Sequence, residues 1–176
     1  MDFPILSSLI LLPSVGALFL LFAKVSTSKN PQTIKYVALF VTFVNFFISI
    51  YLWQLFDKSI YEFQFIEEKK WLDGFINYKV GVDGISILFI VLTTFITPLC
   101  IISVNNSIKS RLKDFLIAIL VLESLMIGVF CSLDLVVFYL FFEGGLIPMF
   151  LIIGIWGGNR RVYSAFKFFL YTLLGS

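Results

Sequence analysis

The stretch LVVFYLFFEGGLIPMFLIIGIW, residues 135–156, determines how this chain folds. Its 22 residues would form a helix of about 33 Å, which is long enough to cross the hydrocarbon core of a bilayer. One carboxylate, Glu143, lies near the middle of this stretch and is followed by Gly144, Gly145 and Pro148. The stretch is therefore predicted to be a transmembrane helix with an acidic residue inside the membrane.

An acidic residue at this depth has two interpretations. An ionised carboxylate in hydrocarbon costs at least about 3 kcal/mol unless it has a partner or water, so Glu143 is a candidate functional residue. Alternatively, it is a protonated, structural glutamate that is hydrogen-bonded to a neighbouring helix. The two glycines favour the functional interpretation, because they allow another helix or water to approach the carboxyl group.

The composition of the whole chain indicates an integral membrane protein. Of its 176 residues, 60% are hydrophobic and 14% are charged, which leaves too little polar surface for a soluble domain. There is no His, and Cys100 and Cys131 are isolated in apolar runs, so we expect no haem, zinc or iron–sulfur cluster on this chain. No phosphate-binding or dinucleotide motif is present. The net charge of +2 is spread over short loops, so we expect no nucleic-acid partner.

Hydropathy predicts an all-α fold, a polytopic transmembrane helix bundle with five full spans, a partial sixth span and a small β-hairpin outside the membrane. The partial span has 14 residues, about 21 Å of helix, which is too short to cross the hydrocarbon core. We therefore expect the sequence to be a piece of a longer protein, or one half of a split protein. The predicted spans are residues 4–23, 36–56, 85–104, 115–133, 135–156 and, in part, 163–176.

The longest hydrophilic segment, residues 57–84, has the pattern of a hairpin. Aromatic and polar residues alternate from residue 61, with the period of two that is typical of a strand. A second alternation follows the turn signal Asp73-Gly74, so we predict a β-hairpin on the membrane surface. Asp83 is placed to cap the helix that follows.

The Lys and Arg residues of the loops predict the orientation of the spans. The loops after the first, third and fifth spans hold three, three and two of them, which gives eight, whereas the hairpin segment on the opposite side holds four. We therefore expect the N-terminus on the periplasmic or intermembrane-space side.

A second acidic residue, Glu123, lies within the fourth span at a depth similar to that of Glu143. A buried carboxyl that is balanced between burial and a nearby cation can bind and release a proton near neutral pH, so both residues are candidates for a proton relay. Lys167 either extends to the headgroups or sets the charge of a neighbouring Glu. Asp134 is more often a helix cap than a relay member, and Asn45 is expected to form an interhelical hydrogen bond.

Several motifs of this chain resemble one family, the proton-pumping antiporter-like subunits of respiratory complex I, which are subunit 4 of the mitochondrial NADH dehydrogenase and chain M of the bacterial enzyme. The resemblance extends over essentially the whole chain. The motifs are FFE (141–143), LIPM (146–149), WG (156–157), GVDGIS (81–86) and FFLYTLLGS (168–176).

This resemblance implies a 14-helix protein with inverted repeats, of which the chain would be the N-terminal portion. It implies that Glu143 is the key carboxylate of a proton channel and is paired with a Lys on a broken helix further along. The implied partners are sister antiporter-like and other membrane-arm subunits, a continuation of the same subunit, and lipids such as cardiolipin. NAD, FMN, iron–sulfur clusters and ubiquinone would reside on other subunits of the complex.

We therefore predict a non-redox, proton-translocating subunit of NADH:ubiquinone oxidoreductase, with Glu143, Glu123 and Lys167 as relay residues. A subunit of a cation/proton antiporter or of a membrane-bound hydrogenase is an alternative, and so is a purely structural fragment of the membrane arm. The lack of a targeting peptide and the abundance of Phe, Ile and Lys favour the mitochondrial inner membrane, with a bacterial inner membrane as the alternative.

Overall fold

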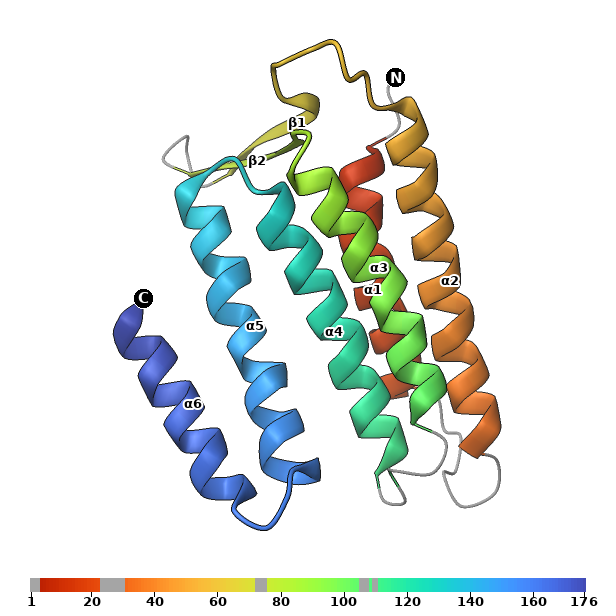
Figure 1. Ribbon diagram of the computed structural model, residues 1–176, viewed down its shortest axis with the longest axis vertical. Coiled ribbons are helices and arrows are strands. Elements are labelled where there is room, and N and C mark those ends of the chain that lie inside the picture. Colours follow the sequence, from red (N-terminus) through yellow and green to blue (C-terminus); the bar gives the residue numbers. More distant parts are fainter. Residues whose placement is uncertain (1–3, 23–30, 72–75, 105–107, 109–110) are drawn as a thin grey trace.

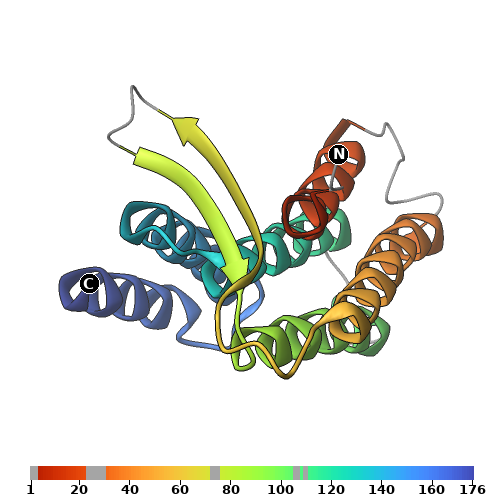
Figure 2. The same ribbon diagram turned by 90° about the horizontal axis from the view of Figure 1, so that it is seen from above.

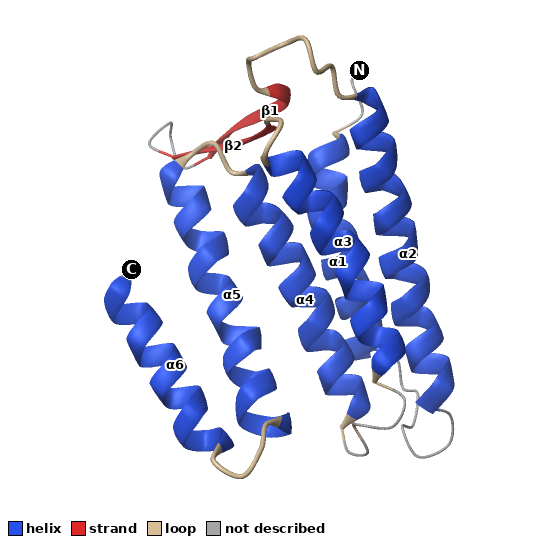
Figure 3. Ribbon diagram, in the orientation of Figure 1, coloured by secondary structure: helices blue, strands red, loops and turns tan. Residues whose placement is uncertain are grey.

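The computed structural model describes residues 4–22, 31–71, 76–104, 108 and 111–176. This part of the chain is mostly helical, with a two-stranded hairpin at one end of a helix bundle (Figures 1 and 3). Five helices are long and apolar enough to cross a membrane, so the predicted fold class is confirmed. The elements are α1 (Ile5–Phe22), α2 (Pro31–Leu55), β1 (Gln64–Trp71), β2 (Ile76–Val82), α3 (Ser86–Ser103), α4 (Leu112–Cys131), α5 (Leu135–Trp156) and α6 (Arg161–Gly175).

Three helices begin before the predicted spans: α2, α4 and, by two residues, α6. α2 begins at Pro31, five residues earlier, because proline is favoured in the first turn of a helix. The extension brings Lys35 into the helix, where its Nζ donates to the carbonyl of Ile102 at 3.0 Å. Ile102 lies in the last turn of α3, where a cation is favourable. α4 begins at Leu112, three residues before the predicted span.

α4 lies at the centre of the bundle. It packs against α1, α2, α3 and α5, whereas α6 packs against α5 at the edge of the molecule (Figure 2). Gly128 of α4 permits a close approach to α5, because a Cβ at this position would lie 2.6 Å from Cδ1 of Phe141. α1 to α4 therefore form a packed four-helix core, and α5 and α6 extend it to one side.

The hairpin lies over one end of the bundle, which we call the hairpin end (Figure 2). β1 and β2 are antiparallel, as predicted, and the Asp73-Gly74 turn lies outside the described residues. The strand begins at Gln64 rather than at residue 61, and the register shifts between Gln64 and Glu67, with Phe65 at φ 53°. This bulge interrupts the alternation of the sequence and turns Glu67 toward α1.

Glu67 joins the hairpin to the first helix. Its Oε1 accepts from the backbone N–H of Leu6 at 2.8 Å, and its Oε2 accepts from the backbone N–H of Ser7 at 3.1 Å and from the Ser7 hydroxyl. These N–H groups at the start of α1 have no partner within the helix, so the carboxylate caps it. The same hydroxyl lies 3.1 Å from that of Tyr78 on β2, and burial raises the pKa of Tyr78.

The hairpin also contacts the turn between α4 and α5. The backbone N–H of Leu133 donates to the carbonyl of Lys79 at 2.9 Å, and Val80 pairs with Ser132. After β2, Asp83 caps α3 as predicted, because its Oδ1 accepts from the backbone N–H of Ser86 at 2.6 Å. This backbone hydrogen bond lowers the pKa of Asp83.

Candidate functional site

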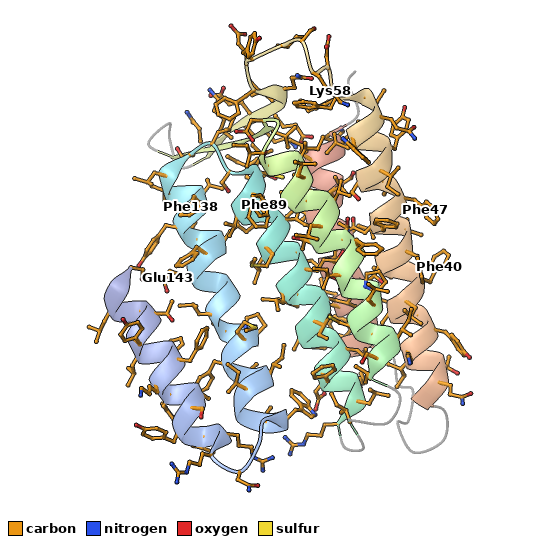
Figure 4. The ribbon with its side chains drawn as sticks, viewed as in Figure 1. Phe40, Phe47, Lys58, Phe89, Phe138 and Glu143 are labelled. Carbon is orange, nitrogen blue, oxygen red and sulfur yellow. The ribbon has the colours of Figure 1, made fainter. Side chains whose placement is uncertain are left out.

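Glu143 lies inside α5, eight residues from Leu135 and therefore about 12 Å from the hairpin end of the helix. Its side chain is partly buried and points between α5 and α6 (Figure 4). Its Oε1 accepts a hydrogen bond from the hydroxyl of Ser176 at 2.5 Å. Among the described residues, no Lys or Arg forms an ion pair with it.

The residues that follow Glu143 leave a polar, open segment in α5. Pro148 has no N–H, so the carbonyl of Gly144, four residues earlier, lacks its usual donor within the helix. A Cβ at Gly145 would meet no atom within 4 Å, so there is open space beside this turn. A carboxyl group and a carbonyl without its helical donor are thus adjacent in the sequence at mid-helix, whereas the space at Gly145 lies on another face of the helix, because residues two apart do not face each other.

Glu123 has the same depth but different surroundings. It lies eight residues before Cys131, the last residue of α4, and its side chain is only 2% exposed. Its Oε1 accepts from Nδ2 of Asn45 on α2 at 2.9 Å, so the predicted interhelical bond of Asn45 is confirmed. Its Oε2 and the Oδ1 of Asn45 are both buried and without a hydrogen-bond partner among the described residues.

The structure does not bring the three predicted relay residues together. Lys167 is exposed on α6, with its Nζ 6.0 Å from the centre of the ring of Tyr163, which lies about one turn earlier in the same helix. Within the described part of the chain it forms no ion pair with either glutamate. Asp134 is a helix cap, as expected, because its Oδ1 accepts from the backbone N–H groups of Val136 and Val137 at 2.9 and 3.1 Å.

A cavity of about 460 Å³ lies between α3, α4 and α5. Glu123, Thr93 and Thr97 contribute to its lining, which is otherwise almost entirely apolar. On the α5 side the lining residues are Met149 and Ile152, and Glu143 is not among the residues of the wall. The cavity therefore offers no polar route from Glu123 to Glu143.

Sequence reasoning missed two features of the site. The pairing of Glu123 with Asn45 was not predicted, although both residues had been placed near the centres of their spans. The contact between Ser176 and Glu143 was not predicted either, because it depends on how α6 folds back along α5.

Taken together, five membrane-length helices, a hairpin at one end of the bundle and two glutamates at one depth define a class of protein, the polytopic membrane proteins with acidic residues inside their helix bundles. A family model described as NADH:quinone oxidoreductase/Mrp antiporter, transmembrane, matches residues 132–176. The chain belongs to this family and corresponds to the N-terminal portion of the subunit called M in bacteria and chain 4 in mitochondria.

The relatives that carry this assignment are longer proteins. The chain is 55% identical over 175 residues to NADH-quinone oxidoreductase subunit M of Rhodobacter capsulatus, which covers 98% of the chain and 33% of the relative. It is 46% identical over 173 residues to NADH-ubiquinone oxidoreductase chain 4 of Marchantia polymorpha, which covers 97% of the chain and 34% of the relative. The chain thus spans about a third of the length of the curated relatives that it matches.

A solved structure shares the fold. A chain of the membrane-bound sulfane sulfur reductase, an archaeal respiratory membrane complex, superposes with a TM-score of 0.74 at 17% sequence identity. The superposition covers 95% of the present chain and 25% of the other. At this identity the likeness concerns the fold alone.

Proposed function

We propose that this chain takes part in proton translocation by an NADH:quinone oxidoreductase, and that Glu143 is the carboxyl group that binds and releases the proton. The observation that carries the proposal is the position of Glu143. It is a partly buried acid in the middle of a membrane-length helix, followed by Gly144, whose carbonyl lacks its helical donor because residue 148 is proline. The high identity to subunit M of a bacterial enzyme supports the same function.

The chemistry of this site is proton loading and release. A carboxylate in hydrocarbon is stable only near a cation or water, so a cation that approaches Glu143 favours release of its proton, and one that withdraws favours uptake. No ion pair of Glu143 is present among the described residues, and Lys167 is exposed beside Tyr163. In this proposal the cation is supplied by Lys167 after a rearrangement, or by a lysine outside this chain. Glu123 is the second proton-binding carboxyl at the same depth.

The proposal places the chain in the membrane arm of complex I, beside sister antiporter-like subunits and the continuation of its own subunit. NAD, FMN, iron–sulfur clusters and ubiquinone would act on other subunits, and no redox step would take place on this chain. The membrane would be the mitochondrial inner membrane or a bacterial inner membrane, since the relatives include both kinds. The N-terminus would lie on the intermembrane-space or periplasmic side.

The substitution Glu143→Gln tests this function, because it keeps the shape of the side chain and removes the titratable group. We expect proton pumping by the assembled complex, measured in vesicles as protons moved per NADH oxidised, to fall at least about tenfold. The matched control is Glu62→Gln, which changes an exposed acid near the hairpin and should leave pumping unchanged. Wild-type pumping by the Glu143→Gln complex would refute the proposed role.

The alternative functions lead to different results. A cation/proton antiporter or hydrogenase subunit would use the same glutamate, so it is distinguished by its partners: co-purification with flavin-containing and quinone-binding subunits favours complex I. A purely structural chain predicts that Glu143→Gln changes assembly but not the number of protons moved by the complexes that do assemble.

A further inference from the structure

The second acid, Glu123, is held in the four-helix core by an amide. Glu123 is 2% exposed and Asn45 is fully buried. The Nδ2 group of Asn45 donates to Oε1 of Glu123 at 2.9 Å, and this bond joins α2 to α4. The two remaining oxygens, Oε2 of Glu123 and Oδ1 of Asn45, belong to the same two groups, and both lack a partner among the described residues. A buried acceptor without a donor costs about 1–3 kcal/mol of stability, so two such oxygens side by side need an explanation.

The neighbouring hydroxyl groups do not supply the missing donor, because their hydrogens are already used. The Ser14 hydroxyl donates to the Ser124 hydroxyl at 2.7 Å, which in turn donates to the carbonyl of Ile10 at 2.5 Å. The hydroxyls of Ser49 and Thr94 lie 2.7 Å apart, and both also contact carbonyl groups of their own helices. These two hydroxyls have two hydrogens for these bonds, so none remains for Asn45.

Within the described part of the chain, no Lys or Arg forms an ion pair with Glu123. On the four helices that pack against α4, the charged side chains are Lys35 of α2 and Glu143 of α5. Lys35 lies ten residues from Asn45, about 15 Å along the helix, and donates to the carbonyl of Ile102. An ionised Glu123 would therefore be an unpaired charge in the core of a membrane protein, which is strongly unfavourable.

We propose that Glu123 and Asn45 form a neutral acid–amide pair, in which Oε2 of Glu123 carries a proton and donates it to Oδ1 of Asn45. The two hydrogen bonds close a ring between the groups, and one proton satisfies both vacant oxygens. The pair holds α2 against α4 while it holds the proton. Building on the proposed function, we infer that Glu123 passes its proton on only when its two bonds to Asn45 open and the carboxyl turns toward the cavity between α3, α4 and α5, whereas Glu143 is only partly buried.

Infrared difference spectroscopy of the assembled complex tests the pair. Glu123→Gln replaces the acid by an amide that can form the same two bonds with Asn45, so the complex should assemble normally. We expect its difference spectrum against wild type to lose one band in the carbonyl-stretch region of protonated carboxylic acids, with no change among the carboxylate bands. Asn45→Leu should keep this band but shift it to higher frequency, because the carbonyl of Glu123 then accepts no N–H.

The control is Glu67→Gln, because Glu67 only accepts hydrogen bonds from the start of α1 and should lose a carboxylate band instead. Loss of a carboxylate band in Glu123→Gln would overturn the proposal, whatever cation or water stabilises that charge. A band that does not move in Asn45→Leu would overturn the pairing. These outcomes are independent of the pumping function, which is tested by Glu143→Gln. If the infrared bands contradict the pair, the proposed function of Glu143 is unaffected. If Glu143→Gln pumps like wild type, the protonated-acid band of Glu123 is still expected.

Discussion

The two glutamates of this chain occupy the same depth in two different kinds of packing. Glu123 lies in the packed core of α1 to α4, at the wall of the apolar cavity between α3, α4 and α5, and its partner Asn45 is fully buried. Glu143 lies on the outer pair α5 and α6, is only partly buried, and accepts a hydrogen bond from the hydroxyl of Ser176 on α6. The comparison teaches that depth in the membrane does not by itself determine what an acidic residue does: the packing around it decides whether a proton can be exchanged.

Two glycines provide the sharpest test of this difference in packing. Gly128→Ala places a Cβ 2.6 Å from the ring of Phe141, so α4 and α5 must move apart, and we expect a loss of about 1–3 kcal/mol in stability. Gly145→Ala meets no atom within 4 Å, and alanine is the better helix former by about 1 kcal/mol, so the fold should tolerate it. The measurement is the thermal stability of the assembled complex for each variant. Equal destabilisation by both would contradict the open space found at Gly145.

Removing the hydrogen-bond partner of each glutamate gives the second test. Asn45→Leu leaves Glu123 buried without its donor, and we expect it to lower the free energy of local opening of α2 and α4 by about 1–2 kcal/mol. Ser176→Ala removes an exposed donor from Glu143 and should change local stability by less than about 0.5 kcal/mol. Hydrogen–deuterium exchange of the helix amides measures both effects. A larger effect of Ser176→Ala would reverse the comparison between the two sites.

Much of the fold could be predicted because membrane spans are long, apolar and nearly free of charge. The central helix, for example, was predicted from residues 135–156, and α5 has the same bounds. The helix ends that were missed depend on contacts that hydropathy does not record. Lys35 ends the apolar run that predicts the span, whereas in the structure it lies inside α2 and donates to the carbonyl of Ile102 on another helix.

The candidate site was only partly predictable for the same reason. The sequence placed Glu123 and Glu143 at equal depth, because depth follows from counting residues along a helix. It could not tell which face each carboxyl occupies, since that depends on which helices pack together. Counting from the span ends would have placed Asn45 near the level of Glu123, but the choice of Asn45 as its partner required the packing of α2 on α4.

The hairpin offers a third comparison, between two adjacent acids on β1. Glu67 caps α1, whereas Glu68 forms a surface ion pair with Lys79 at 3.5 Å. Glu67→Ala should destabilise the start of α1 by about 1 kcal/mol, the typical cost of a lost cap, and Glu68→Ala by less than that. Amide exchange at Leu6 and Ser7 measures the difference. If the two substitutions loosen α1 equally, Glu67 is not its cap.

The smallest expected effect concerns the start of α3, at the surface, and it is tested by a change of pH instead of a substitution. The backbone hydrogen bond from Ser86 lowers the pKa of Asp83 below its ordinary value of 3.8, so the folded state favours the carboxylate. The contribution of this cap to stability is therefore present above pH 3.8 and is lost as the pH falls through the lower, folded-state value. Amide exchange at Ile85 and Ser86, corrected for the intrinsic effect of pH, should accelerate modestly in acid.

The substitution Asp83→Asn distinguishes this effect from unfolding of other parts of the protein in acid. Asparagine still caps a helix but does not titrate in this range, so the variant should lose the acid-induced acceleration at the start of α3. The pair of Glu123 and Asn45 should show no change over the same pH range, because an acid that already carries its proton cannot take up another. Acid-induced opening of α2 and α4 in the Asp83→Asn variant would therefore contradict the neutral pair of Glu123 and Asn45. It would also contradict the difference in acid response between surface and buried acids.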